Sequence, residues 1–278
     1  MPRKINDTLI TRMLEGDLSE FFNYVQIHTQ TLRLEARLKG KANIYYKKCK
    51  ILDLGPRSYH IDGKYFDDKK EPKNIKEMIL DRPNEYFEYV IPIVDRWLDN
   101  NHKDEFETQQ NIARDNQNEY CKYLILDMEY NFSQETILEE NRVKQAGFDL
   151  LGIERESGKV ILFEVKRGLD ALTGKSGIKD HIKDFEEYLY GANSTTFRNI
   201  LNDDVEHIIR DKIRLGLIDL PEMPDINTND EVEFIFIYEP NEPTLEEYIA
   251  AYEEEYRQSE SVHIYETIFV SKNNYELV

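Results

Sequence analysis

Short apolar runs separated by charged turns mark the centre of this chain. The runs Phe148–Ile153 and Val160–Val165 are joined by a charged turn that contains Gly158. Runs of this length, rich in Val, Ile, Leu and Phe, predict the two strands of a β-hairpin. A third run, Tyr123–Phe132, comes earlier in the chain and predicts the first strand of the same sheet.

The spacing of apolar residues also predicts the elements on either side of this hairpin. Helices are expected over Asp7–Tyr24 with a break near Gly16, over a segment from Asn74 that Pro92 kinks or divides, and over Lys103–Asn118. Two alternating runs around Gly40, Leu32–Leu38 and Ile44–Leu54, predict a long hairpin. Beyond the central hairpin we expect helices at Ile178–Tyr190, Thr195–Leu217 and Leu245–Arg257, and strands at Glu233–Tyr238 and Val262–Val270.

This order of elements predicts an α/β fold in which helices flank a mixed central β-sheet. The best linker candidate is the polar stretch Asp67–Pro72. We therefore expect an N-terminal lobe of helices and a β-hairpin at residues 1–72, followed by a larger domain at residues 73–278.

Three charged residues interrupt the apolar pattern of the central hairpin: Asp149 on its first strand, and Glu164 and Lys166 on its second. Because side chains alternate along a strand, Glu164 and Lys166 point the same way and Val165 points opposite. A charge inside a core strand is costly unless it is paired or binds a metal. Two carboxylates suit Mg²⁺, and a nearby lysine can help activate water or offset charge on a phosphoryl group. The alternative is a solvated edge hairpin in which Glu164 and Lys166 only pair with each other.

Asp149, followed on the next strand by Glu164-Val165-Lys166, resembles the signature of the PD-(D/E)XK nuclease superfamily. The resemblance covers roughly Asn111–Tyr238 and implies a restriction-endonuclease-like core. It implies a metal-dependent nuclease that hydrolyses phosphodiester bonds of nucleic acid, with DNA favoured over RNA. Asp149, Glu164 and the Val165 carbonyl are the implied ligands of Mg²⁺ or Mn²⁺, and Lys166 is the implied catalytic lysine. Phe148 precedes the aspartate in place of the proline of the signature, as in divergent members.

Two further residues are expected to assist this site. Glu129 shares a face of the predicted strand Tyr123–Phe132 with Asp127, and it is the candidate for a supporting metal ligand; the alternative is that this end of the strand is exposed. His181 lies at the edge of the apolar face of the helix Ile178–Tyr190, where it either assists the site or is an ordinary half-buried histidine. The triplet Gly174-Lys175-Ser176 lacks the first glycine of a P-loop, so we expect no nucleotide binding there.

Charge is distributed unevenly along the chain. The formal net charge of -19 opposes binding to nucleic acid, because such binding depends on neutralising phosphates. The acidity is concentrated in Leu217–Val278, whereas Gln30–Lys50 carries seven basic residues and a single acid. A local basic field can still receive a polyanion. The basic residues expected to contact nucleic acid are Arg33, Arg37, Lys39, Lys41, Lys47 and Lys48, with Tyr45 and Tyr46 as a stacking platform. The alternative is that these lysines lie on the wet face of an exposed sheet.

The remaining features limit where the protein works. Cys49 and Cys121 have no metal-binding spacing, which favours a reducing compartment. No apolar stretch is long enough for a signal peptide or a membrane span, so we expect a cytoplasmic protein without a membrane partner. A homodimer stays open. Two rival functions stay open as well: a nuclease-fold module that binds nucleic acid without cutting it, and an acidic interaction protein that mimics a polyanion.

Overall fold

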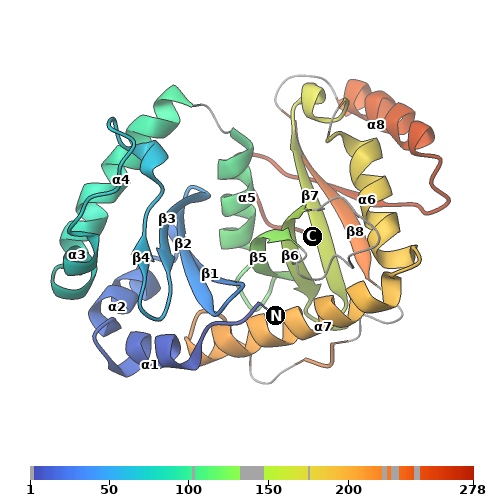
Figure 1. Ribbon diagram of the computed structural model, residues 1–278. Helices are drawn as coiled ribbons and strands as arrows, with labels where there is room; N and C mark the ends of the chain where they lie inside the picture. The colour runs from blue at the N-terminus through green and yellow to red at the C-terminus, as the bar shows by residue number, and fades with distance from the viewer. Residues whose placement is uncertain are drawn as a thin grey trace. The chain divides into compact units, whose positions relative to one another are not determined.

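A computed structural model describes residues 3–101, 104–131, 147–174, 176–220, 224–226, 232–240 and 245–278 (Figure 1). The chain forms two compact units. Unit 1 contains Met1–Glu107 and His207–Leu220, and unit 2 contains Thr108–Glu206 and Pro221–Val278. The chain therefore divides at Glu107 and Thr108, beyond the expected linker Asp67–Pro72, and a later segment returns to unit 1. Both units are mixtures of helices and strands, so the expected α/β class is confirmed.

Unit 1 combines a four-stranded antiparallel sheet with helices. Its sheet has the order β1-β2-β3-β4, and its helices include the end of a long helix that begins in unit 2. The strands are β1 (Leu32–Arg37), β2 (Lys41–Tyr46), β3 (Cys49–Leu54) and β4 (Tyr59–His60). The helices are α1 (Asp7–Glu15), α2 (Ser19–Ile27), the short η1 (Gly63–Tyr65), α3 (Ile75–Asp81), α4 (Pro83–Asn100) and the end of α7 (Ser194–Arg214). The break expected near Gly16 is confirmed, and Pro92 lies inside α4 without dividing it.

The expected single strand Ile44–Leu54 is wrong, because the chain reverses in its middle. Lys47 and Lys48 have φ angles of 48° and 56°, and they join β2 to β3. Two successive residues in the left-handed region reverse an antiparallel pair in the sense of its natural twist. Residues other than glycine and asparagine are uncommon in that region, so the Lys-Lys pair gave no turn signal.

Unit 2 is built on a five-stranded mixed sheet with the order β5-β6-β7-β8-β9. Strand β6 (Gly147–Glu154) is antiparallel to both of its neighbours, β5 (Tyr123–Asn131) and β7 (Val160–Arg167). Strands β8 (Glu233–Glu239) and β9 (Glu266–Phe269) continue the sheet in parallel to β7. Helix α5 (Asp104–Asp115) precedes the sheet, α6 (Ile178–Tyr190) and α7 connect β7 to β8, and α8 (Leu245–Ser259) connects β8 to β9. Parallel strands require such crossover connections.

Aromatic contacts show which face of this sheet α6 and α8 cover. Phe185 of α6 stacks on Phe234 of β8 at 4.7 Å between ring centroids, and Tyr248 of α8 stacks on Tyr238 of β8 at 3.7 Å. Phe234 and Tyr238 lie in register with Leu162 and Lys166 of β7. The face of β7 that carries Glu164 and Lys166 is therefore the face toward α6 and α8.

The predicted elements of unit 2 agree with the structure to within a few residues, except at the last strand. Strand β9 covers only Glu266–Phe269, whereas Val262 and Ile264, which were expected to lie in it, are exposed. None of the helices in the described ranges is long and apolar enough to cross a membrane.

Candidate active site

The end of the β6–β7 hairpin brings Asp149 next to the strand that carries Glu164 and Lys166. Regular pairing of β6 with β7 extends from Ile153↔Val160 to Leu150↔Phe163. Asp149 is one residue beyond the last pair. Its Oδ2 atom accepts a hydrogen bond of 2.9 Å from the backbone N–H of Val165. The carboxylate of Asp149 is thus held at the edge of β7, beside the residue that separates Glu164 from Lys166.

Glu164 is the centre of a buried charge cluster. Its Oε1 atom lies 2.6 Å from Nζ of Lys166 and 2.9 Å from Nε2 of His181 on α6. Glu164 and Lys166 are only 3% and 6% exposed. The expected common face of Glu164 and Lys166 is therefore observed, and it faces the helix that carries His181.

This environment keeps Glu164 ionised. Burial by itself raises the pKa of a carboxyl group. For Glu164 this effect is outweighed by the positive charge of Lys166 and by the contact with His181, which lower its pKa to about 2. An ionised carboxylate is the form that binds a cation.

A loop residue that the sequence did not indicate holds the other side of Lys166. The Nζ atom of Lys166 donates a second hydrogen bond, 3.1 Å long, to the carbonyl oxygen of Ser176. Ser176 has a φ of 69°, and its own N–H donates to Oδ2 of Asp180 at 3.2 Å. Ser176 acts through its backbone, so its side-chain type carried no signal. In the sequence, the Gly-Lys-Ser triplet indicated only an incomplete P-loop, not a contact with Lys166.

Glu129 lies level with Asp149 on the neighbouring strand. The residues on each side of it, Met128 and Tyr130, pair with Leu150 and Phe148. Glu129 itself has a φ of 56°, which is uncommon for a residue other than glycine. The register therefore brings Glu129 to the same end of the sheet as Asp149 and Glu164. Its side chain is half-buried, and its positive φ makes the backbone of β5 irregular at this residue.

The candidate metal ligands come from adjacent strands. Within the described residues, no group of three or more His, Cys, Asp and Glu side chains is arranged to hold a metal ion. Mg²⁺ needs fewer protein ligands, since it is usually bound by one or two carboxylates together with waters and substrate phosphates. Asp149 and Glu164 could supply these carboxylates. The N–H and C=O of one strand residue point to the same side, so the Val165 carbonyl is directed to the edge where Asp149 lies.

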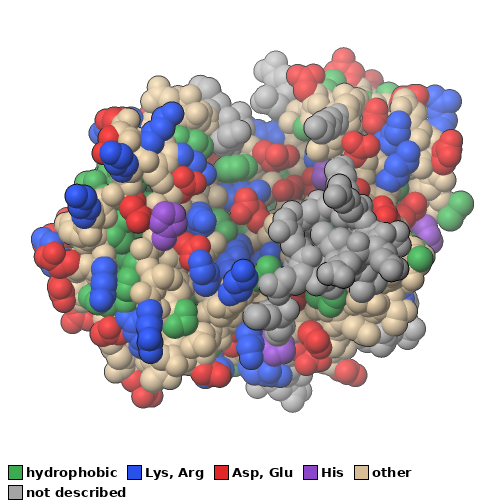
Figure 2. All heavy atoms as spheres, in the orientation of Figure 1, with side chains coloured by type: hydrophobic (Ala, Val, Ile, Leu, Met, Phe, Trp, Pro, Cys, Tyr) green, Lys and Arg blue, Asp and Glu red, His purple; other side chains and the backbone are tan. Residues whose placement is uncertain are grey.

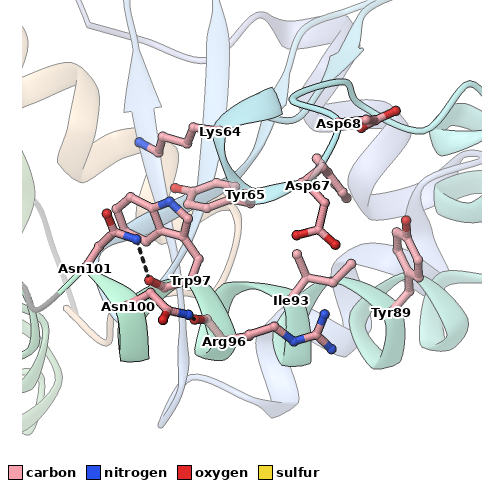
Figure 3. A pocket seen from close by; sticks show the side chains of 11 residues that line it. Lys64, Tyr65, Asp67, Asp68, Tyr89, Ile93, Arg96, Trp97, Asn100 and Asn101 are labelled. Carbon is pink, nitrogen blue, oxygen red and sulfur yellow. Dashed lines mark hydrogen bonds between the residues drawn. The ribbon is translucent and has the colours of Figure 1, made fainter.

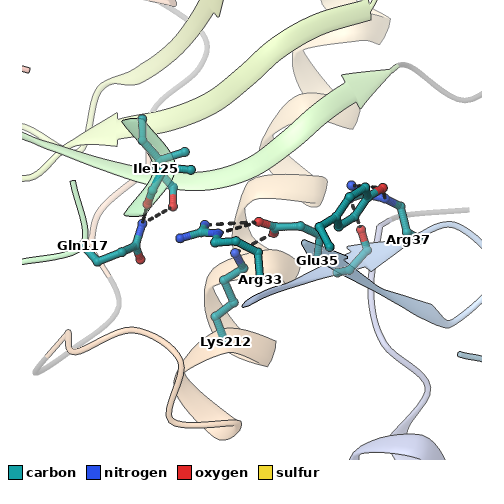
Figure 4. A network of polar contacts seen from close by, with 9 residues as sticks. Arg33, Glu35, Arg37, Gln117, Ile125 and Lys212 are labelled. Atoms are coloured by element: carbon teal, nitrogen blue, oxygen red, sulfur yellow. Dashed lines mark hydrogen bonds and ion pairs between the residues drawn. The ribbon is translucent and has the colours of Figure 1, made fainter. Parts of the chain in front are cut away.

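The basic residues of the N-terminal sheet do not form one exposed surface. Arg33 is buried, and its Nη2 atom lies 3.1 Å from Oε1 of Glu35. Nζ of Lys212 reaches the other oxygen of Glu35 at 2.6 Å (Figure 4). Lys48 is also buried, with its Nζ 4.7 Å from the ring centroid of Phe106. Arg33 and Lys48 are therefore placed inside unit 1, where their charges are matched by internal contacts.

The other four predicted contacts lie nearer to solvent. Lys39 is exposed in the turn between β1 and β2, and Arg37 donates a hydrogen bond of 2.9 Å to the hydroxyl of Tyr45. Lys41 and Lys47 are half-buried and form ion pairs of 3.0 and 2.9 Å with Asp53 and Asp95, respectively.

Tyr45 and Tyr46 are buried, so the structure contradicts their expected role as a stacking platform. On the face of unit 1 seen in Figure 2, Lys and Arg side chains are interspersed with Asp and Glu. Together with the ion pairs of Arg33, Lys41 and Lys47, this view shows acids placed beside the basic residues of unit 1.

Comparisons with known proteins identify no relative of this chain. The chain matches no protein-family model, no curated protein and no solved structure. Function must therefore be argued from the chemistry of the site.

Proposed function

We propose that unit 2 is a metal-dependent nuclease, with DNA as the first substrate to test. The observation that carries this proposal is the position of Asp149. Its carboxylate bonds to the backbone of β7 between a buried, ionised Glu164 and a buried Lys166. Ion-paired carboxylates are common in proteins, but a second carboxylate, Asp149, beside the Glu164–Lys166 pair at the open end of one hairpin matches the chemistry of phosphodiester hydrolysis.

The order of elements in unit 2 supports the same proposal. A helix, three antiparallel strands, crossover helices and a fourth strand parallel to the third follow one another from α5 to β8. This is the layout that a restriction-endonuclease-like core requires, and the candidate residues lie on its second and third strands.

In this proposal Asp149, Glu164 and the Val165 carbonyl hold Mg²⁺ or Mn²⁺. When bound, the metal would polarise the phosphate and acidify a water molecule. Glu164 needs no deprotonation to act as a ligand, because its pKa is already lowered to about 2. Lys166, positioned by the Ser176 carbonyl, is directed to stabilise negative charge on the attacking water or the phosphate. His181 orients Glu164, and Glu129 supports Asp149 from β5.

Cleavage assays on single-stranded DNA, duplex DNA and RNA, with Mg²⁺ or Mn²⁺, test this function. We expect Asp149→Asn, Glu164→Gln and Lys166→Ala each to reduce cutting by roughly a hundredfold or more. Lys159→Ala is the matched control. Lys159 forms an ion pair of the same length, 2.6 Å with Glu233, next to β7 but at its opposite end. Equal cutting by all four variants, or none by the wild-type protein under any of these conditions, would refute the proposal.

Calorimetric titration with Mg²⁺ and Mn²⁺ tests the metal site separately. The wild-type protein should bind the ion, and the Asp149→Asn/Glu164→Gln variant should not. Metal binding that survives in the double variant would place the ion elsewhere.

One observation favours a second candidate, a nuclease-fold module that binds nucleic acid without cutting it. Glu164 is already satisfied by Lys166 and His181, so the cluster could serve stability alone. In that case the wild-type protein would bind nucleic acid without cutting it, and Lys166→Ala would leave this binding unchanged.

A further inference from the structure

A hollow in unit 1, far along the sequence from the hairpin, combines aromatic walls with opposite charges. It has a volume of about 390 Å³ and lies between the turn Lys64–Asp68 and the C-terminal half of α4 (Figure 3). Volumes of this order are typical of sites for small molecules. None of the residues assigned above to the nuclease chemistry lines it.

Aromatic rings come from both walls of this hollow. Tyr65 meets Trp97 edge to face, with 5.3 Å between ring centroids. Phe66 and Tyr89 are nearly parallel, at 6.3 Å and 22°. Tyr89 remains 42% exposed, although aromatic side chains usually bury a large area. The exposed ring therefore offers a flat surface on which a planar group can stack.

Charged groups of both signs surround these rings. Figure 3 shows the Asp67 carboxylate directed from the turn toward α4 and the Arg96 side chain lying along α4, and both residues line the hollow. Nζ of Lys64 lies 5.0 and 5.5 Å from the ring centroids of Tyr65 and Trp97. The side-chain amide of Asn101 donates to the Trp97 carbonyl at 2.8 Å, so it covers the negative end of the helix beside the site.

We infer that this hollow binds one nucleotide of a single-stranded nucleic acid. The base would stack on Tyr89, an amino group of the base would donate to Asp67, and the phosphate would meet Arg96 and Lys64. A purely anionic ligand would leave the rings and Asp67 unused. An apolar ligand would cover the exposed charges of Arg96 and Asp67 without offering them matching groups, which is unfavourable. Base stacking combined with a cation for the phosphate is the usual chemistry of single-strand binding. This inference does not depend on cleavage by unit 2.

Trp97 makes the test direct, because it is the single tryptophan of the chain. The full-length protein is titrated in EDTA with GMP, AMP, CMP and UMP, and then with short single-stranded DNA. Tryptophan fluorescence is corrected for nucleotide absorbance. We expect a saturable change with nucleotides and none with ribose 5-phosphate, which lacks the base.

Three variants locate the binding. Tyr89→Ala and Arg96→Ala should each weaken binding by roughly five- to 150-fold, the range for loss of one stacking or charged contact. Both residues are at least partly exposed, so the variants should fold. Arg57→Ala is the control, because Arg57 is an exposed arginine of the same unit that does not line the hollow.

Four outcomes would overturn the inference. The first is no fluorescence change with any nucleotide, and the second is equal weakening by Arg57→Ala. The third is binding that depends on Arg96 but not on Tyr89, which would indicate a phosphate site without base recognition. The fourth is a response to tetramethylammonium but not to nucleotides, which would assign the rings to a cationic ligand. EDTA removes metal-dependent cutting, so a failure here is distinct from a failure of the nuclease proposal.

Discussion

Replacing Lys166 by methionine removes the cation that is closest to the buried carboxylate of Glu164. The two groups are 2.6 Å apart, and neither side chain is more than 7% exposed. Removing one partner of a buried pair leaves an uncompensated charge and costs about 3–5 kcal/mol. His181 can offset part of this cost, since its Nε2 lies 2.9 Å from the same carboxylate oxygen. We therefore expect Lys166→Met to lower the free energy of unfolding by roughly 3 kcal/mol.

A matched ion pair in the same sheet separates burial from pairing. Lys159 and Glu233 are also 2.6 Å apart, but their side chains are 23% and 43% exposed. Pairs of this kind contribute about 1 kcal/mol or less. Lys159→Met should therefore lower the free energy of unfolding only slightly. The chemical change from Lys to Met and the ion-pair distance are nevertheless the same as for Lys166→Met.

Urea unfolding followed by circular dichroism measures these differences. The single variant Glu164→Leu and the double variant Lys166→Met/Glu164→Leu complete the cycle. The double variant removes both charges and leaves apolar groups of similar size. We expect the double variant to be more stable than Lys166→Met alone. Equal losses of unfolding free energy in Lys166→Met and Lys159→Met would refute the argument from burial. So would a loss in the double variant that equals the sum of the losses in Lys166→Met and Glu164→Leu.

Three other predictions follow from the same structure. The pKa of Glu164 is lowered to about 2 from an ordinary value of 4.5, so its charge stabilises the fold above pH 4.5 and this contribution is lost as the pH falls toward 2. The free energy of unfolding should thus fall less steeply with acid in Glu164→Gln than in the wild type; parallel curves would contradict the assignment. Gly152→Ala would place a methyl group 2.8 Å from the Leu124 carbonyl oxygen, and this overpacking should cost about 1–3 kcal/mol. The cost should be measurable as a lower melting temperature. An unchanged melting temperature would mean that β5 can move aside. Lys212→Met would leave the fully buried Glu35 with one cation fewer, and it should destabilise unit 1 by roughly 3 kcal/mol. Urea unfolding followed by Trp97 fluorescence measures this loss. The control Lys41→Met, at an ion pair nearer to solvent, should cost about 1 kcal/mol or less.

Local sequence pattern was sufficient for most elements of unit 2. The helix predicted over Ile178–Tyr190 is α6, and the predicted runs Phe148–Ile153 and Val160–Val165 lie within β6 and β7. Each element buries one face or the whole of its length, and burial leaves a periodic record in the sequence. The pattern was misleading where the backbone conformation was unusual. Lys47 and Lys48 form a tight turn without glycine, and the apolar residues Val262 and Ile264 are exposed outside β9.

The sequence by itself also determined that Glu164 and Lys166 share one face, because side-chain alternation depends only on their separation along the strand. Only the tertiary structure decided the partners of these residues. His181 reaches Glu164 from another element, Ser176 holds Lys166 through its carbonyl, and Asp149 bonds to a backbone N–H that a sequence does not distinguish from any other.

The basic residues of the N-terminal sheet show the same limit. Arg33 was expected to contact nucleic acid, but it is buried beside Glu35, whose second cation, Lys212, comes from 177 positions further along the chain. Charge along a sequence records which residues are basic, whereas burial depends on folding contacts between distant segments. A sequence therefore predicts the secondary structure and the candidate chemistry of this protein, but the pairing of its charges is decided only when the chain has folded.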